Sequence, residues 1–274
     1  MTTIALVLGA GGARGIAHIH ALQAFDDLGV RPTLIAGTSI GAIIGAGYCA
    51  GMTGDAVETY VRHSLEDRKR LITKAFQVRP SSIKDFFADG GLRLGELNLE
   101  SILSVFLPAA IPATFEDLTL PLHAVATDYY GESDTVFTSG PLTGVLAASA
   151  AMPAVFLPVR VGDRYYIDGS STNPCPLNIV QNQADAVIAI DASGGTSGAA
   201  DVRPSKIDVM YASSQIMQQS IVRSMAREYP QTVLLRPSVK GFRSLDFLKV
   251  SDILTATAPL REAVKVEIAR LLGG

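Results

Sequence analysis

The chain has 274 residues, of which 48% are hydrophobic and 18% are charged, and its formal net charge is −3. These values exclude a disordered or fibrous protein and suffice for one large globular domain or two small ones. Acidic residues slightly outnumber lysine and arginine, which are not massed in one segment. The composition therefore argues against a nucleic-acid partner.

The cysteines and the N-terminus indicate the cellular compartment. Cys49 and Cys175 form neither a CxxC pair nor a short Cys/His spacing, so we predict no metal and no other cofactor. No positive residue precedes the first apolar run, which reaches glycine by Gly9, unlike a secretory signal or an anchor. We expect a cytoplasmic protein that begins at Met1, with peripheral contact at the inner face of the membrane left open.

The first fifty residues contain the pattern of strand, turn and helix twice. Residues 3–9 are an apolar run that ends in glycine, and residues 14–29 then place apolar side chains at helical spacing. A second strand ends at Gly37, and a helix is expected from about Ser39 to Cys49. Two consecutive β-turn-α units predict a parallel sheet.

Two uncharged stretches, 34–52 and 138–159, are long enough to resemble membrane spans. Both are interrupted by Gly, Ser, Thr or Pro and lack the steady Leu, Ile and Phe content of a lipid-facing helix. We therefore predict in each a buried strand that runs into a buried helix.

Residues 53–120 differ from the segments around them. They have mixed charge, short helical patterns and no strand signal. The pattern predicts a helical insertion or cap over one end of the sheet, within a single domain of residues 1–274. A helical layer with a purely structural role fits the pattern equally well.

Further apolar runs complete the predicted sheet. Strands are expected at 122–128, 185–191 and 231–237, and a hairpin with its turn at Gly162-Asp163 follows "FLPVRV". Residues 258–274 have the pattern of an amphipathic helix that closes at Gly273.

The first candidate site is the glycine-rich "LGAGGARG", which follows a strand and opens a helix. A dinucleotide-binding fingerprint would place its third glycine at Arg14 and an acidic residue at the end of the second strand, which instead ends in Ile35, Ala36 and Gly37. The loop keeps a cluster of backbone N–H groups that suits any anion, a phosphate or an ester's oxyanion alike. A tight structural turn is the alternative.

The second candidate is Gly37-Thr38-Ser39-Ile40-Gly41, which matches G-x-S-x-G between a predicted strand and a predicted helix. In such a turn the flanking glycines, Gly37 and Gly41, allow close backbone approach and the serine can be a nucleophile. An ordinary serine N-cap is an equally supported alternative at this stage.

A nucleophilic serine needs a base, and the histidines do not supply one in the usual Ser, Asp, His order. His18 and His20 lie two residues apart in the first helix, which favours packing or capping roles. A carboxylate partner is then expected, and Asp128, Asp168 and Asp191 all end predicted strands. Asp168 is slightly favoured, because it follows an apolar strand and precedes a glycine.

Taken together, "GAGGARG", "GTSIG" and "YYIDGSSTNP" resemble the patatin-like phospholipase family, as does the segment before the aspartate. The resemblance covers roughly residues 4–192, and is greatest to small bacterial members and the esterase domain of neuropathy target esterase. It implies a three-layer α/β/α fold around a mainly parallel sheet, which the β-turn-α pattern suggests independently. The chain departs from the family pattern at Ala10, His20 and Ser170.

The resemblance also implies roles for individual residues. Ser39 would be the nucleophile and Asp168 its base, while the backbone amides of Gly11, Gly12, Ala13 and Arg14 would form the oxyanion hole. The Arg14 side chain would shape the loop rather than react.

The expected activity is hydrolysis of lipid acyl esters, in a phospholipid or lysophospholipid, through an acyl-enzyme. A non-catalytic module that binds an anionic lipid or a nucleotide, and an acyltransferase with the same dyad, remain alternatives. For membrane contact, residues 105–115 are the best apolar candidate, although core packing is the favoured role for them.

Overall fold

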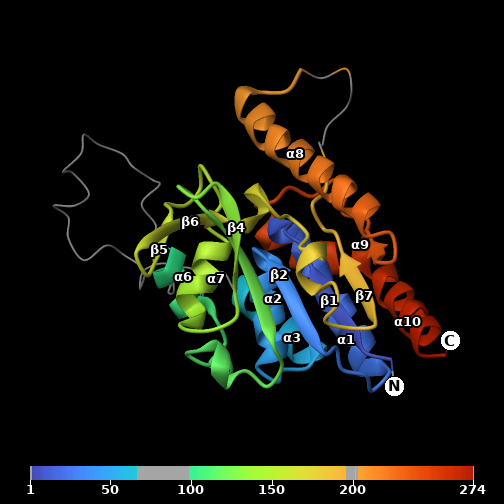
Figure 1. The fold of residues 1–274 in the computed structure, drawn as a ribbon. Coiled ribbons are helices and arrows are strands. Elements are labelled where there is room, and N and C mark those ends of the chain that lie inside the picture. The colour runs from blue at the N-terminus through green and yellow to red at the C-terminus, as the bar shows by residue number, and fades with distance from the viewer. Residues whose placement is uncertain (1, 67–98, 196–200, 202, 274) are drawn as a thin grey trace.

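The computed structural model describes residues 2–66, 99–195, 201 and 203–273. At its centre lies one mixed, mostly parallel sheet with helices on both faces (Figure 1). The strands, in chain order, are β1 (Ile4–Leu8), β2 (Leu34–Thr38), β3 (Leu122–Asp128), β4 (Ser133–Phe137), β5 (Val159–Val161), β6 (Arg164–Asp168), β7 (Ala186–Ile190) and β8 (Val233–Leu235). The predicted α/β/α architecture with a mainly parallel sheet is confirmed.

The order of pairing is β5-β6-β3-β2-β1-β7-β8, and β4 also pairs with β3. All pairs among β1, β2, β3, β7 and β8 are parallel, whereas β4, β5 and β6 pair antiparallel. The predicted hairpin is present, with Gly162 at φ +63° in its turn. The sequence patterns thus predicted every strand except β4.

The central strands are buried on both faces, as parallel strands between helices must be. On one face, Leu6, Leu8 and Ile35 belong to the large core. On the other face, Val7 and Ala36 belong to a smaller core that includes Val222. Successive residues of one strand therefore serve opposite cores, which follows from the period-two alternation of side chains.

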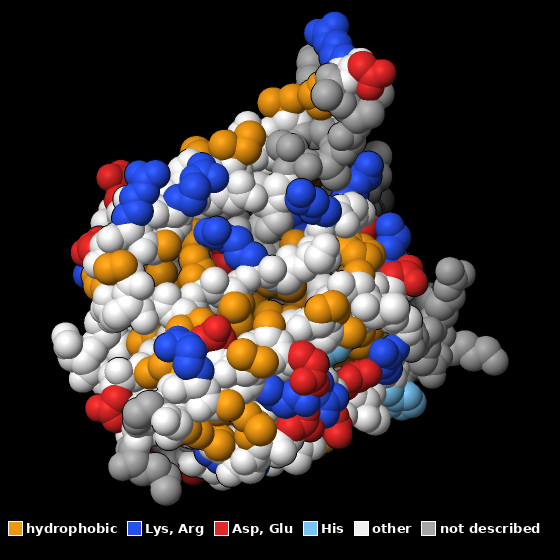
Figure 2. All heavy atoms as spheres, turned by 90° about the vertical axis from the view of Figure 1, so that its right-hand side faces the viewer, with side chains coloured by type: hydrophobic (Ala, Val, Ile, Leu, Met, Phe, Trp, Pro, Cys, Tyr) orange, Lys and Arg blue, Asp and Glu red, His pale blue; other side chains and the backbone are white. Residues whose placement is uncertain are grey.

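The larger core is covered by most of the helices and the smaller one by α8. The helices are α1 (His18–Asp27), α2 (Ile40–Cys49), α3 (Gly54–Glu66), α6 (Leu99–Phe106), α7 (Leu142–Ser149), α8 (Lys206–Glu228), α9 (Val250–Thr257) and α10 (Pro259–Leu272). Figure 1 shows the N-terminal part of α8 projecting away from the body of the molecule. Acidic and basic side chains are interspersed on the face seen in Figure 2.

The two uncharged stretches have different structures. Residues 34–52 form β2 and then α2, as predicted. In 138–159 the predicted order is wrong: α7 comes first, and a turn leads from it to the short strand β5. Proline at 141, directly before α7, favours a helix start over a strand at this point. Among the described residues no helix is both long and apolar enough to cross a membrane.

The predicted insertion, 53–120, contains α3 and α6. Its residues 67–98 lie outside the described part of the chain. The described part contains no strand, in line with the missing strand signal.

Candidate active site

Two strand ends meet on one edge of β3. Ala124 pairs with β2 and β4, and Ala126 pairs with β4 and β6. A residue pairs only once on each edge of its strand, so β2 and β6 share the edge opposite β4. The end of β2 at Thr38 therefore lies next to the end of β6 at Asp168. This register brings Ser39 and Asp168 together from positions 129 residues apart in the sequence.

Ser39 projects from a strained turn towards Asp168. Its Oγ donates a hydrogen bond of 2.7 Å to Oδ2 of Asp168. The backbone of Ser39 has φ 58° and ψ −125°, a conformation that non-glycine residues rarely adopt. Its side chain makes no capping hydrogen bond to α2. The alternative of an ordinary serine N-cap does not describe this residue.

Glycine is required on both sides of the Ser39 turn. A Cβ at Gly41 would lie 2.0 Å from the Leu8 carbonyl oxygen, and a Cβ at Gly37 would lie 2.6 Å from the backbone of Ala42. Both distances are shorter than real contacts, so the close approach of β1, β2 and α2 excludes larger residues.

Ser149, at the end of α7, fixes the turn from behind. Its Oγ accepts a hydrogen bond of 2.9 Å from the Ser39 N–H and donates one of 2.6 Å to the Val125 carbonyl of β3. Ser149 was not among the candidate residues predicted from the sequence. The available signal was a single polar residue inside the apolar run "VLAASAAM".

Asp168 is a buried carboxylate with a defined orientation. It is only 3% exposed, and its Oδ1 accepts a 2.8 Å hydrogen bond from the Ser170 N–H. Burial raises the pKa of the Asp168 carboxyl, and the hydrogen bonds from Ser170 and Ser39 offset only part of this effect. A higher proton affinity makes the carboxylate a better base.

The other two candidate aspartates are paired elsewhere. Asp128 forms an ion pair of 2.5 Å with Arg164, and Asp191 forms one of 2.8 Å with Arg236. Of the three strand-end aspartates, only Asp168 contacts Ser39.

The histidines do not reach Ser39 within the described residues. His18 is buried, with its Nε2 2.7 Å from the Gly9 carbonyl. His20 lies between Gln23 and the Leu254 carbonyl. Burial lowers the pKa of His18 to about 4, so this ring is neutral at physiological pH. Both residues have the packing roles that the sequence indicated.

The glycine-rich loop lies against the Ser39 turn. A Cβ at Gly15 would lie 2.2 Å from Cγ2 of Ile40. Gly12 has φ +58°, and a Cβ there would lie 2.3 Å from the Ser244 carbonyl oxygen. Glycine is therefore required at Gly12 by conformation and by space.

The four predicted oxyanion-hole residues differ in what they offer. The Ala13 N–H already donates to the Ser244 carbonyl at 2.8 Å. Among the described residues, no hydrogen-bond acceptor is found for the N–H groups of Gly11 and Gly12. The Arg14 side chain is buried, where its Nε donates to the Gly11 carbonyl and its Nη2 donates to Ser244. The Ala13 N–H is therefore already engaged, whereas the N–H groups of Gly11 and Gly12 remain free donors among the described residues.

Three glutamines of α8 connect the loops around the site. Gln215 donates to Ser244, Gln218 donates to Ser170 beside Asp168, and Gln219 donates to the Gly194 carbonyl. No glutamine motif was singled out in the sequence, because the loops that these side chains join are far apart along the chain.

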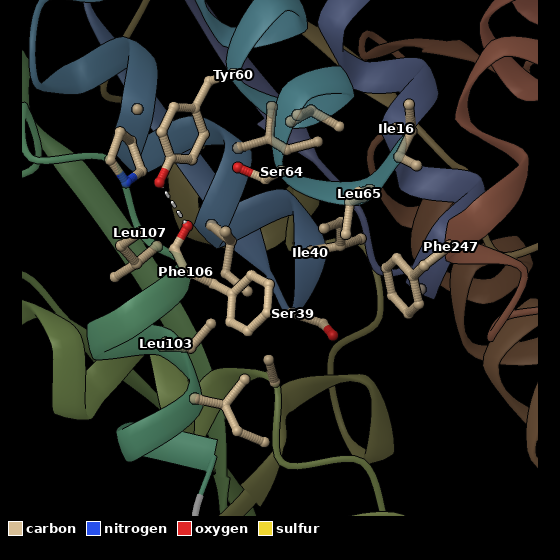
Figure 3. Close-up of a pocket in the computed structure, with 18 of the residues that line it drawn as sticks. Ile16, Ser39, Ile40, Tyr60, Ser64, Leu65, Leu103, Phe106, Leu107 and Phe247 are labelled. Atoms are coloured by element: carbon tan, nitrogen blue, oxygen red, sulfur yellow. Dashed lines mark hydrogen bonds between the residues drawn. The ribbon is translucent and has the colours of Figure 1, made fainter. Parts of the chain in front are cut away.

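An apolar cavity of about 360 Å³ opens beside Ser39 (Figure 3). Side chains from α2, α3 and α6 form most of its wall, and Gly12 and Ser39 also line it. The apolar side chains from these helices are Ile40, Ile43, Ile44, Val57, Val61, Leu65, Leu99, Ile102, Leu103 and Phe106. This volume is within the range of small-molecule sites, and the wall suits a hydrocarbon chain.

Phe106 and Leu107, from the predicted membrane-contact segment 105–115, line this cavity. Phe115 of the same segment is buried in the core. In the described part of the chain, no group of three or more His, Cys, Asp or Glu residues could hold a metal ion.

Comparison with known proteins identifies similar chains. The family model described as "Patatin-like phospholipase" matches residues 6–180, a range that contains the glycine-rich loop, Ser39 and Asp168. An uncharacterised NTE family protein of Mycobacterium tuberculosis is 32% identical over 203 residues, which are 73% of this chain and 52% of the relative. Patatin-like phospholipase domain-containing protein 6 of Homo sapiens is 28% identical over 278 residues, with 92% of this chain and 19% of the relative covered.

The chain thus spans about half the length of the mycobacterial relative and about a fifth of the human one. Among solved structures, VipD from Legionella pneumophila is similar with a TM-score of 0.52. The match covers 96% of this chain and 67% of that chain at 15% identity, so it concerns the fold alone.

Proposed function

Because the chain belongs to the patatin-like phospholipase family, we propose that it is a serine acyl hydrolase that cleaves phospholipid or lysophospholipid acyl esters through a Ser39–Asp168 dyad. One observation carries the proposal. A serine on a strained strand-to-helix turn donates to a buried carboxylate and faces an apolar cavity.

The reaction follows from the geometry. Asp168 accepts the Ser39 proton while Oγ attacks the ester carbonyl, and the N–H groups of Gly11 and Gly12 stabilise the oxyanion. Collapse of the intermediate expels the alcohol, which takes the proton from Asp168. Water then attacks the acyl-enzyme while Asp168 accepts its proton. Collapse of this intermediate releases a fatty acid, and Oγ of Ser39 takes the proton back from Asp168. The cavity holds the acyl chain during both steps.

The proposed lipid surface contact differs from the predicted segment 105–115. Three leucines are exposed at or beside residues that line the cavity: Leu157 is 50% exposed, Leu245 48% and Leu248 63%. Leu245 itself lines the cavity, and Leu157 and Leu248 follow the lining residues Phe156 and Phe247. Exposed apolar side chains at a cavity mouth suit contact with a bilayer surface. Liposome flotation should weaken when the three leucines are replaced by aspartate, with Leu28→Asp as a matched control for an exposed leucine away from the cavity.

The decisive experiment combines a fluorophosphonate probe with a lipid hydrolysis panel. Wild-type protein should be labelled and should release fatty acid, whereas Ser39→Ala should do neither. Ser104→Ala is the matched control, because this serine on α6 is exposed and, among the described residues, donates to the Ser101 carbonyl alone. Labelling that persists in Ser39→Ala would contradict the proposal. Product analysis with an added alcohol separates hydrolysis from acyl transfer, and ligand binding without any turnover would favour the non-catalytic alternative.

A further inference from the structure

One polar group stands out in the wall of the cavity. Ser64, on α3, lines the cavity and is 4% exposed. Its Oγ has no hydrogen-bond partner among the described residues. Figure 3 shows this oxygen on the cavity side of α3, among apolar side chains.

An unpartnered buried hydroxyl is costly, because it has lost water without gaining another partner. A serine inside a helix commonly avoids this cost by donating to the carbonyl four residues earlier. Ser64 makes no such bond. Valine or alanine at this position would complete the apolar wall without the cost of burying a hydroxyl. A hydrogen bond from Ser64 to an atom of the bound ligand would offset that cost.

We propose that the acyl chain bound in the cavity carries a hydroxyl group that hydrogen-bonds to Ser64. This inference rests on the proposed function and specifies its substrate class. A hydroxyl suits the position because Ser64 can both donate and accept. Tyr60, one turn earlier on α3, also lines the cavity with a hydroxyl, which donates to the Phe106 carbonyl at 3.0 Å. Together they form a polar spot in an otherwise apolar wall.

The order of residues along the helices indicates where this spot lies. A Cβ at Gly47 would lie 3.4 Å from Cγ2 of Val57, so the start of α3 lies beside the end of α2. Ser64 is about two helical turns further along α3. In Figure 3, Ser64 lies between Tyr60 and Ile40, the residue that follows Ser39, so this direction leads towards the Ser39 end of the cavity. We therefore expect the substrate hydroxyl in the half of the acyl chain nearer to the ester.

The test measures binding to the full-length Ser39→Ala protein, which keeps the cavity but should not turn over esters. Hexadecanoic acid and its monohydroxylated positional isomers compete with a fluorescent fatty acid. One isomer with the hydroxyl in the carboxyl-proximal half should bind roughly 3- to 10-fold more tightly than the unsubstituted acid. Adding Ser64→Ala should remove this preference without weakening the unsubstituted acid.

Val61→Ala on the same helix is the matched control, because it removes wall contacts but no hydroxyl. It should weaken all the acids alike and keep the preference. Equal binding of plain and hydroxylated acids, or a preference that persists in Ser64→Ala, would overturn the inference. Ser39-dependent hydrolysis that continues in that case leaves the proposed function intact, whereas absent binding of every acid counts against both.

Thermal unfolding of the free protein gives a second readout. Removing an unpartnered buried hydroxyl should leave Tm unchanged or raise it. A clear decrease in Tm for Ser64→Ala would mean that the hydroxyl has a structural partner in the free protein, which would also overturn the inference.

Discussion

The polar frame behind Ser39 and the apolar cavity in front of it are held together differently. The frame is formed by Ser39, Ser149, Asp168 and Ser170, which are linked to one another by hydrogen bonds of 2.7 to 2.9 Å with a defined direction. In the cavity, apart from the hydroxyls of Tyr60 and Ser64, the wall is made of apolar contacts without a preferred direction. Substitutions in the frame should therefore change the rate of the chemical step, and substitutions in the wall should change which chain is accepted.

The largest effect is expected for Asp168→Asn, which removes the proposed general base from the frame. The amide can keep the hydrogen bonds to Ser39 and Ser170 but cannot accept the serine proton. We expect kcat to fall roughly 10³- to 10⁴-fold in an ester hydrolysis assay. A decrease of less than tenfold would contradict the assignment of Asp168 as the base.

The same variant should unfold less readily at neutral pH. Because folding raises the pKa of Asp168, protonation of this carboxyl favours the folded state at low pH. That stabilisation is lost as pH rises through the folded pKa, so the ionised carboxylate lowers the free energy of unfolding at neutral pH. Wild-type kcat/KM should fall with decreasing pH through that pKa, while the Asp168 contribution to the free energy of unfolding grows. The difference between the wild-type and Asp168→Asn unfolding curves, measured against pH, isolates this contribution.

Gly12→Ala should have the next largest effect, because it displaces the proposed oxyanion donors of the glycine-rich loop. A side chain at Gly12 meets the Ser244 carbonyl at 2.3 Å, so the loop must move. We expect kcat to fall about 10²- to 10³-fold. Gly29→Ala is the matched control: Gly29 has φ +62° but nothing within 4 Å of an added Cβ. It should cost about 1 kcal/mol of stability and leave kcat unchanged; equal kcat losses in both variants would show that the effect is general destabilisation.

Protonation of His18, which lies against the Gly9 carbonyl of the glycine-rich loop, should destabilise the protein at acid pH. The His18 pKa of about 4 lies below the ordinary value of 6.5, so the unfolded chain takes up this proton first. The free energy of unfolding should therefore decrease by about 3 kcal/mol as pH falls from about 6.5 towards 4. His18→Gln should flatten this dependence in chemical denaturation, whereas the exposed His63→Gln should keep it. A wild-type curve that is flat over this window would contradict the prediction.

The smallest effect is expected in the wall. Gly47 lines the cavity, and a Cβ there would make only ordinary contacts, at 3.4 Å to Val57 and 3.6 Å to Met52. Gly47→Leu should therefore narrow the cavity without displacing the frame. We expect kcat/KM for long-chain esters to fall about tenfold, while that for an acetyl ester, which serves as the internal control, stays the same. An equal decrease for both esters would contradict the separation of frame and wall.

Much of the fold could be predicted from the sequence, because β1, β2, β3 and β7 are short apolar runs with glycine or aspartate at or beside their ends. β4 was missed because its sequence, "SDTVF", is polar and partly exposed, as on an edge of the sheet. α8 was not predicted, because its apolar and polar residues are only weakly separated onto two faces of the helix. Only part of α8, such as Val222, packs against the sheet.

The sequence motifs pointed to Ser39 and Asp168, which the structure brings together, but not to the residues that surround them. Ser39 and Asp168 lie in local motifs that a sequence displays. Ser149, Ser244 and the glutamines of α8 act through contacts between distant segments, which no local pattern encodes. The unpartnered hydroxyl of Ser64 is likewise invisible in the sequence, because only the packing of α2, α3 and α6 reveals its surroundings.

The meeting of β2 and β6 on one edge of β3 has a consequence for how this architecture can diversify. The proposed nucleophile and base follow strands that pair with the same strand, β3, while α3 and α6, which form much of the cavity wall, belong to the segment inserted between β2 and β3. That segment can change in length and composition without moving either residue. Substrate range can then evolve by exchanging the insertion, while the reaction chemistry is inherited intact.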